Sequence, residues 1–264
     1  MTFVPADDAD VYILSFPKCG RTWLRLLIVK ALSLGFELPM ELCRDLEPAD
    51  FARAAPESLP VIAFLHDGDP GGRSPAEQNP DKSWYADRRV VFLTRDLRDV
   101  IVSHYFQRTR RQTHPYVGTL SEFLDEERGS LRSCIAYWNI WHAHRHTPSA
   151  FLDLSYERLT DDPAGELGRV LAFCGVPAVD PAVLEEAVRY AAFANMRAME
   201  ATGTLDSRRL RPGDPMDPES YKTRRGVVGG YRDYLTQDQI RFVNTVITEN
   251  LTASRHPAAF AAGP

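Results

Sequence analysis

The sequence predicts an α/β fold in which helices flank a central parallel β-sheet. Four short runs rich in β-branched and aromatic residues are mostly apolar instead of alternating, which is typical of strands covered on both faces. Helical patterns separate these runs, and strands that alternate with helices indicate βαβ units. The 264 residues, 44% hydrophobic and 25% charged, match an ordinary globular protein, and we expect a single domain over residues 1–264.

The predicted strands and helices alternate along the first two thirds of the chain. The strands are Val11–Ser15, Val61–Leu65, Val90–Thr94 and Phe151–Ser155. The helices are Thr22–Leu34, Leu97–Gln107, Leu120–Asp125 extending toward His144, and Ala164–Phe173. In such a fold the carboxyl ends of the parallel strands form the edge where ligands bind.

The last third is predicted to be helical, with one long loop. A helix is expected from Pro181 to about Met199, and a loop rich in charged residues, Pro and Gly follows from Thr202 to about Gly230. We expect this late loop to be mobile or to close over a ligand. The final helix begins with a capping box formed by Thr236 and Gln239. One face of that helix is apolar: Ile240, Val243, Val246, Ile247 and Leu251.

Composition and charge exclude several classes of protein. The net charge is −5, and the residue content fits neither a disordered chain, a collagen repeat nor a disulfide framework. The four cysteines form no CxxC pair, which indicates reduced thiols. The longest apolar stretch, Trp23–Leu34, contains Arg25 and Lys30 and is too short to span a bilayer, and the acidic N-terminus shows no secretory signal. We therefore expect a cytoplasmic protein. The 27 arginines against four lysines are typical of a GC-rich bacterial genome.

The segment after the first strand has the features of a phosphate-binding turn. It reads Pro17-Lys18-Cys19-Gly20-Arg21-Thr22-Trp23, and a helix begins within it. Gly20 permits a turn whose backbone N–H groups converge on an anion, and the helix N-terminus adds positive potential. Lys18 supplies a point charge, Thr22 a hydroxyl and Arg21 a second cation.

This turn is not the P-loop of a nucleoside triphosphatase. The pattern GxxxxGK[ST] is absent, because the Lys precedes the Gly and no Gly lies five residues before Gly20. Cys19 follows Lys18 where a Mg²⁺-binding Ser or Thr would stand. A metal-dependent P-loop kinase, a phosphotransferase for a nucleotide or small molecule, stays the runner-up.

A polyanion binder is a third class of function to consider. Six arginines in two clusters motivate it: Arg108, Arg110, Arg111, Arg208, Arg209 and Arg211. The two clusters are far apart in sequence, and Asp206, Asp214 and Asp217 accompany the second one. A solvated loop explains such a pattern better than a binding stripe, and we expect no nucleic-acid partner.

The phosphate-binding turn resembles the 5′-phosphosulfate loop PKxGTTW of the sulfotransferase family. Arg21 replaces the first Thr of that pattern, and Cys19 occupies a position usually held by a small residue. Cys19 is either a thiol whose pKa is lowered by Lys18 and the helix N-terminus, or a small side chain that fits the turn. The resemblance implies a three-layer P-loop-like fold. It also implies contacts to 3′-phosphoadenosine 5′-phosphosulfate (PAPS) from Lys18, Cys19, Gly20, Arg21, Thr22 and Trp23.

A second match follows the third strand, where Arg95 begins a segment that resembles the family's 3′-phosphate pattern RxxxDxxxSxY. The planar guanidinium of Arg95 can bind a phosphate through two hydrogen bonds. Ser103 lies eight residues later on the same helix face, so its hydroxyl can reach the same anion. Asp99 between them is expected to orient Arg95 or to cap the helix.

Three further elements resemble the family's nucleotide-binding segments. Arg224-Arg225-Gly226 in the late loop is similar to the RKGxxG element that wraps the 3′-phosphate. Tyr156 lies in an element on the adenine side, and Phe193 lies in a segment similar to FxxMK, which covers the adenine. Trp23 would stack on the other face of the base, and stacking stabilises such complexes by roughly 1–3 kcal/mol per base.

The candidate general base is His66, at the end of the second strand. An imidazole with a pKa of about 6.5 can deprotonate a hydroxyl as the new bond forms. The position resembles the His of the family's KTH element, but Phe64 replaces the Lys, which leaves more of the charge stabilisation to Lys18. His142, His144 and His146 form an HxHxH run, yet alternate residues on a helix diverge, so we expect no metal site there.

The resemblance implies in-line transfer of a sulfuryl group from PAPS to a hydroxyl or amine, with Lys18 and His66 as catalytic residues. The product would be adenosine 3′,5′-bisphosphate (PAP), with no metal and no covalent enzyme intermediate. Candidate residues for the acceptor pocket are Trp84, Tyr85, Phe106 and Tyr116. Aromatic content favours a small or amphipathic acceptor, a glycan- or lipid-type molecule included, over a long polyanion. The family's dimer motif KxxxTVxxxE is degraded, so the oligomeric state stays open.

Overall fold

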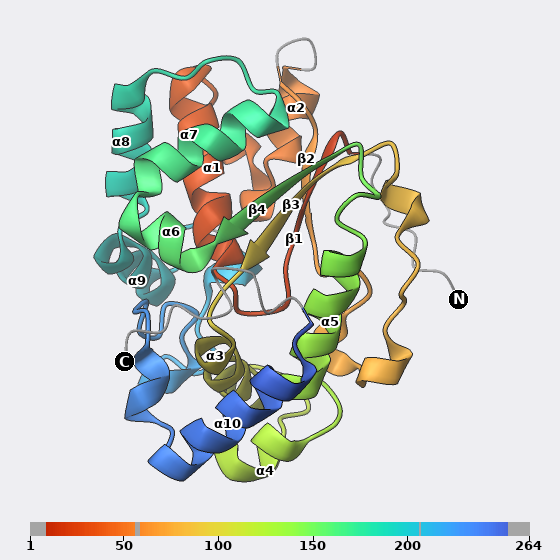
Figure 1. The fold of residues 1–264 in the computed structure, drawn as a ribbon. Coiled ribbons are helices and arrows are strands. Elements are labelled where there is room, and N and C mark those ends of the chain that lie inside the picture. The colour runs from red at the N-terminus through yellow and green to blue at the C-terminus, as the bar shows by residue number, and fades with distance from the viewer. Residues whose placement is uncertain (1–8, 56–58, 206, 253–264) are drawn as a thin grey trace.

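A parallel sheet between two layers of helices forms the centre of the molecule (Figure 1). The computed structural model describes residues 9–55, 59–205 and 207–252, so both ends of the predicted domain 1–264 lie outside the described residues. The strands are β1 (Val11–Leu14), β2 (Ile62–Leu65), β3 (Arg89–Thr94) and β4 (Ala150–Ser155). They pair in the order β2-β1-β3-β4, and each pairing is parallel. The predicted α/β fold class is confirmed.

Two sets of helices cover the two faces of the sheet (Figure 1). One set contains α1 (Arg21–Gly35), α6 (Tyr156–Asp161), α7 (Pro163–Cys174) and α8 (Pro181–Tyr190). The other contains α3 (Leu97–Arg110), α4 (Leu120–Asp125), α5 (Leu131–Ala143) and α10 (Gln237–Asn250). Two more helices are α2 (Ala49–Ala54), which packs against β2, and α9 (Phe193–Thr202). Crossover helices on both faces are what a parallel sheet requires, because both of its faces are apolar.

The central strands are buried on both faces, as their unbroken apolar runs predict. All four residues of β1 are fully buried, and Val90, Val91 and Leu93 of β3 are buried with them. Burying one such side chain stabilises the fold by about 1.5–3 kcal/mol. β4 lies at an edge of the sheet, and its first four residues are only half-buried.

Two predicted helices are each divided in two. The helix expected to extend toward His144 is interrupted at Gly129, whose φ of 71° suits Gly, and an added Cβ there would lie 2.2 Å from the Gly71 carbonyl. The helix expected over 181–199 is interrupted at Ala191, where the Arg189 carbonyl accepts hydrogen bonds from the Ala192 backbone N–H, over 3.3 Å, and from the Asn195 side chain, over 2.8 Å. This second break makes Phe193 the first residue of α9. The short helices α2 and α6 were not predicted.

The capping box of the final helix is confirmed. The backbone N–H of Gln239 donates to the Thr236 hydroxyl over 3.2 Å, and the Thr236 N–H donates to the Gln239 side chain over 2.8 Å. Val243, Val246 and Ile247 form the buried face of α10.

Candidate active site

A cavity of about 630 Å³ lies where β1, β2, β3 and β4 end. It brings together segments that are more than 200 residues apart in the sequence, from Pro17 to Gly226. Nearly all of the predicted site residues line it: Lys18, Gly20, Arg21, Thr22, Trp23, His66, Arg95, Ser103, Tyr156, Phe193, Arg224, Arg225 and Gly226. Cys19 does not.

The turn between β1 and α1 presents an uncapped helix N-terminus to the cavity. Lys18 and Gly20 both have positive φ, 76° and 95°, which folds the backbone tightly before the first helical residue, Arg21. A Cβ at Gly20 would lie 2.5 Å from the Tyr156 ring, so the close approach requires Gly. No side chain of the described residues caps α1, and its first turn contains no acidic residue. Its free N–H groups suit an anion.

Cys19 points away from the cavity into the core, where it is fully buried. Burial raises the pKa of its thiol to about 12. Of the two interpretations of Cys19, the structure favours the small side chain that fits the turn. The predicted contact to PAPS is therefore restricted to the Cys19 backbone.

Arg95 directly follows β3, and its guanidinium contacts both an aromatic ring and a backbone carbonyl. Its guanidinium stacks on the Tyr156 ring at 4.2 Å and donates to the Val227 carbonyl over 3.0 Å. Its Nε atom is buried without a partner among the described residues. Of the two roles expected for Asp99, orienting Arg95 fits the structure, because its carboxylate forms an ion pair with the Arg95 guanidinium at 3.6 Å, whereas Asp96 is the residue that caps α3. Asp99 also accepts hydrogen bonds from the backbone N–H groups of Gly229 and Tyr231. Asp99 therefore anchors the late loop.

Three aromatic rings line the cavity near this point, those of Trp23, Tyr156 and Phe193. Trp23, from the first turn of α1, packs edge-on against Tyr156 at 5.6 Å, and Phe193, at the start of α9, is 43% exposed. Gly226 allows the late loop to pass over Phe193, because a Cβ there would lie 2.3 Å from the ring. An exposed aromatic ring beside a cavity suits a stacked base.

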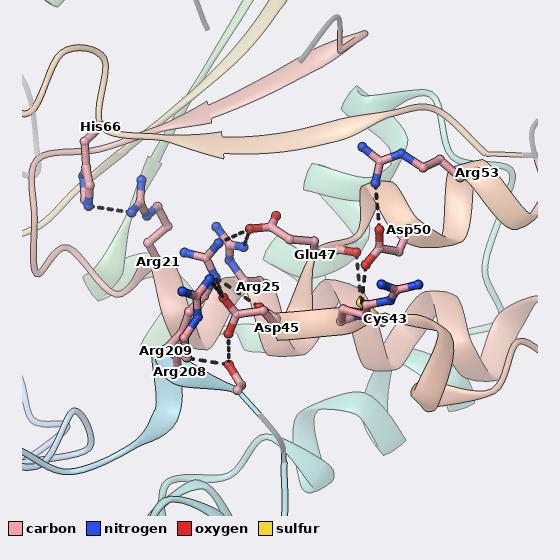
Figure 2. Close-up of polar contacts among 12 residues, drawn as sticks. Arg21, Arg25, Cys43, Asp45, Glu47, Asp50, Arg53, His66, Arg208 and Arg209 are labelled. Atoms are coloured by element: carbon pink, nitrogen blue, oxygen red, sulfur yellow. Dashed lines mark hydrogen bonds and ion pairs between the residues drawn. The ribbon is translucent and has the colours of Figure 1, made fainter. Parts of the chain in front are cut away.

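His66 is held by two hydrogen bonds, one at each ring nitrogen, and Figure 2 shows the one with Arg21. Nδ1 lies 2.8 Å from the Ser15 carbonyl and must carry the proton, because a carbonyl only accepts. Nε2 lies 2.5 Å from an Arg21 guanidinium nitrogen and must accept. Burial, and next the Arg21 charge, hold the pKa of His66 well below its usual value. His66 is therefore a neutral imidazole with its lone pair toward Arg21.

Lys18 lies in a cluster of cations. Its Nζ is 3.4 Å from the Gln107 side-chain oxygen. Burial lowers the pKa of Lys18 well below its usual value, and the charge of Lys222 is the next cause, followed by that of Arg111. Lys222, in the late loop, also lines the cavity and was missed in the sequence. Lys222 belongs to no motif in the sequence, and the scarcity of lysine in this chain was the one feature that could have pointed to it.

The late loop is fixed beside Lys222 by a buried carboxylate. Glu200, 1% exposed on α9, accepts hydrogen bonds from the backbone N–H groups of Lys222, over 2.5 Å, and Thr223, over 2.8 Å. The Thr223 hydroxyl and an Arg111 guanidinium nitrogen bind the same carboxylate. The predicted mobility of the loop stays a prediction, but the described part of it is tied to α3 and α9.

A second set of contacts ties the same loop to the segment before α2 (Figure 2). Arg209 forms ion pairs with Glu47 and with Asp45, and Asp45 also accepts a hydrogen bond from the Ser207 hydroxyl over 2.7 Å. Glu47 is shared with the buried Arg25 of α1. Arg25 lies 4.3 Å above the ring of Phe64, the residue that replaces the family's Lys.

The four aromatic residues expected in the acceptor pocket do not line the cavity. Trp84 and Tyr85 pack edge-on against Tyr12 in the core. Phe106 packs against Tyr234, and Tyr116 packs against Tyr105 and Phe123. The prediction that these four residues line the acceptor pocket is therefore wrong, because their rings pack against other aromatic rings.

The described residues contain neither a cluster of metal-binding side chains nor a membrane-spanning helix. Within residues 9–55, 59–205 and 207–252, no three His, Cys, Asp or Glu side chains gather closely enough to hold a metal ion. In the same part of the chain, no helix has the length and apolar character needed to cross a bilayer. A metal-free reaction stays a prediction.

Comparison with known proteins identifies the family. Residues 73–255 match the sulfotransferase domain. The chain belongs to the sulfotransferase family. Among curated relatives of this sulfotransferase, flavonol 3-sulfotransferase from Flaveria bidentis is 25% identical, with 94% of this chain and 84% of that protein aligned. Cytosolic sulfotransferase 17 from Arabidopsis thaliana is 23% identical, with 94% and 75% aligned.

Solved structures support the fold of this sulfotransferase. A mouse sulfotransferase complexed with PAP superposes with a TM-score of 0.63 at 20% identity, covering 93% of this chain and 85% of that one. Retinol dehydratase in a complex with retinol and PAP superposes with a TM-score of 0.61 at 19% identity, covering 94% and 82%. The two curated relatives come from plants and the first solved structure from mouse, and the bacterial origin suggested by composition stays a prediction.

Proposed function

We propose that this sulfotransferase moves a sulfuryl group from PAPS to a hydroxyl or amine of a small-molecule acceptor, leaving PAP as the product. The observation that carries the proposal is that one cavity contains both predicted phosphate-binding segments and the candidate base, His66. Two solved structures of similar fold are complexes with PAP, and some curated relatives are named for flavonol acceptors. We also propose that the protein acts in the cytoplasm.

The charges of the cavity fit the donor. Seven cationic side chains line it: Lys18, Arg21, Arg95, Arg108, Lys222, Arg224 and Arg225. Asp69 is the one acidic side chain among the described residues of the lining. The unpartnered Nε of Arg95 is buried beside the predicted 3′-phosphate site. A molecule with two phosphate groups would neutralise this excess of positive charge.

In the proposed mechanism, each residue acts at a defined place. The turn at Lys18 and Gly20 and the N-terminus of α1 bind the 5′-phosphosulfate, and Lys18 neutralises charge on the leaving oxygen. Arg95, Ser103 and the backbone near Gly226 hold the 3′-phosphate. His66 removes the proton of the attacking hydroxyl at Nε2. PAPS supplies the sulfuryl group, and positioning supplies much of the rate.

Ligand binding tests the proposal. PAP should raise the melting temperature without Mg²⁺, because a ligand that binds only the folded state stabilises it. A labelled-donor screen with product detection by mass spectrometry should then show sulfated acceptors. The runner-up kinase requires the opposite pattern: stabilisation by ATP with Mg²⁺ and no effect of PAP. That pattern would refute the proposal.

A further inference from the structure

The order of the strands separates the cavity into two sides. The predicted nucleotide-binding residues Arg95 and Tyr156 follow β3 and β4, whereas His66 follows β2 at the other edge of the sheet. The wall beyond His66 is formed by the chain that continues from it and by the second half of α3. His104 and Arg108 contact the Gly71 carbonyl at 3.3 and 3.1 Å, which joins these two segments.

The two sides differ in polarity. Apolar lining occurs on the nucleotide side, from Trp23, Ala191, Phe193 and Met196. Beyond His66 the described lining is mostly polar: Asp69, Gly71, Gly72, Gln107, Arg108 and Gln112, with Pro17 beside Gly71 as the apolar exception. The Gly71 and Gly72 carbonyls are already hydrogen-bonded, so the polar side chains present the remaining donors and acceptors. A surface of amides and charges suits hydroxyl groups, because each hydroxyl both donates and accepts hydrogen bonds. It offers little to a planar aromatic ring.

Lys222 adds a positive charge to this cavity that is only partly neutralised, because burial and the charges of Arg111 and Arg21 lower its pKa while the Glu200 charge raises it. The nearby carboxylate, Glu200, already binds the Lys222 and Thr223 N–H groups, the Thr223 hydroxyl and Arg111. Asp69 lies near two other cations, Arg73 and Arg108. The Lys222 ammonium is close enough to His66 and His104 for its charge to add to the effect of burial in lowering the pKa of each.

We infer that the acceptor is a hydroxyl-rich molecule that also carries an acidic group, of the sugar-acid class, and that Lys222 binds this acidic group while a hydroxyl faces His66. The inference rests on the proposed function and narrows its acceptor. Glu200 accepts a hydrogen bond from the Lys222 backbone N–H, so the segment that carries this ammonium is fixed beside the cavity. A half-buried ammonium among other cations is unfavourable, and an acidic acceptor reduces that repulsion.

A matched pair of acceptors tests the inference. Methyl β-glucuronide and methyl β-glucoside differ by one carboxylate, and 4-nitrophenol represents a planar phenol. With PAPS as donor, kcat/KM should be about tenfold or more higher for the glucuronide than for the glucoside, and 4-nitrophenol should be the poorest of the three. A preference for 4-nitrophenol, or no turnover of either glycoside, overturns the inference.

Variants of Lys222 locate the preference. Lys222→Met should bring the glucuronide-to-glucoside ratio close to one, and this fall in the ratio should exceed any loss of PAP affinity measured by calorimetry on the same variant. Lys222→Arg should retain part of the preference, and Lys30→Met, a lysine change outside the cavity, should retain all of it. A ratio unchanged in Lys222→Met overturns the inference. Loss of PAP binding by the wild type would instead refute the proposed function.

Discussion

Arg21 donates a hydrogen bond to Nε2 of His66 over 2.5 Å, so the nitrogen that would receive the acceptor's proton is already occupied. Arg21 stands where the sulfotransferase pattern has Thr, and it lies in the first turn of the helix that faces the donor site. An anion bound there competes for the Arg21 guanidinium. Donor binding and release of the base are therefore expected to be coupled.

The pH dependence of the reaction should reflect this contact. Because burial and the Arg21 charge lower the pKa of His66, the base stays neutral at mildly acidic pH, and the acid limb of kcat/KM should lie below an ordinary imidazole pKa of about 6.5. Arg21→Met removes one cause and should move that limb to higher pH. NMR titration of the His66 ring measures the same pKa directly. An acid limb at the ordinary value in the wild type would contradict this prediction.

Replacing the base should affect acceptors according to their acidity. His66→Ala is expected to reduce transfer to an alcohol by about 10²- to 10⁴-fold, because no other group takes the proton. An acidic phenol, already partly ionised, should lose much less. Calorimetry should show that PAP still binds to the variant. If His66 is only structural, the variant will have a lower melting temperature and normal turnover per folded molecule.

The 3′-phosphate assignment makes a prediction about two ligands. Arg95→Ala and Ser103→Ala should weaken binding of PAP far more than binding of adenosine 5′-monophosphate, which lacks the 3′-phosphate. For Arg95 we expect a loss of about 1.5–3 kcal/mol, typical of a hydrogen bond to a charged group. Titration calorimetry with both nucleotides measures the difference. Equal losses for both nucleotides would assign these residues to another role.

Gly203 and Gly226 have the same φ of 66°, so substitutions at the two positions distinguish the effect of backbone strain from that of steric contact. Gly226→Ala should weaken PAP binding, because its new Cβ would lie 2.3 Å from the Phe193 ring and displace it from the cavity. Gly203→Ala creates the same strain with no atom within 4 Å, so it should cost about 1–3 kcal/mol of stability at most and leave PAP affinity unchanged. Calorimetry and thermal melts on both variants test the pair. Equal effects on PAP binding would contradict a contact between Gly226 and a base-stacking ring.

Glu200 is predicted to control the late loop. Glu200→Gln replaces an acceptor by an amide with only one acceptor oxygen, which should cost about 1–3 kcal/mol and expose residues near 213–223 to limited proteolysis. PAP should restore protection, since Arg224 and Arg225 gain a phosphate partner. Glu186→Gln, at an exposed ion pair on α8, is the control and should change neither property. Unaltered proteolysis in Glu200→Gln would mean that other contacts hold the loop.

The features that the sequence predicts correctly are those set by short, local patterns of residues. The apolar strands, the capping box of Thr236 and the turn at Gly20 each depend on residues that are close in the chain, and each was predicted. Most of the candidate site was predicted in the same way, because strand ends in a parallel sheet meet at one edge. The contact of Asp99 with the late loop was not predicted, because its partners Gly229 and Tyr231 are 130 and 132 residues away.

Other features could not be predicted because they depend on packing across the molecule. Trp84 and Phe106 are aromatic residues of the kind that line ligand pockets, and only the fold shows that they pack against other aromatic rings. The break before Phe193 follows no Pro or Gly. Lys222 belongs to none of the sequence motifs. Its position depends on the hydrogen bond from its backbone N–H to Glu200, a carboxylate on α9.

The scarcity of lysine gives this protein an unusual chemical reactivity. Of its four lysines, Lys18 and Lys222 line the cavity, Lys82 is buried against Asp67, and Lys30 lies over the Tyr190 ring. Burial, and next the Arg111 charge, lower the pKa of Lys222 to about 7, so without a bound anion a large share of this amine is unprotonated and nucleophilic at neutral pH. Burial also lowers the pKa of Lys18 well below its usual value. An acylating reagent used at neutral pH should therefore modify these two cavity lysines before Lys30 and Lys82. PAP should block the modification, and peptide mapping of the labels would then report site occupancy.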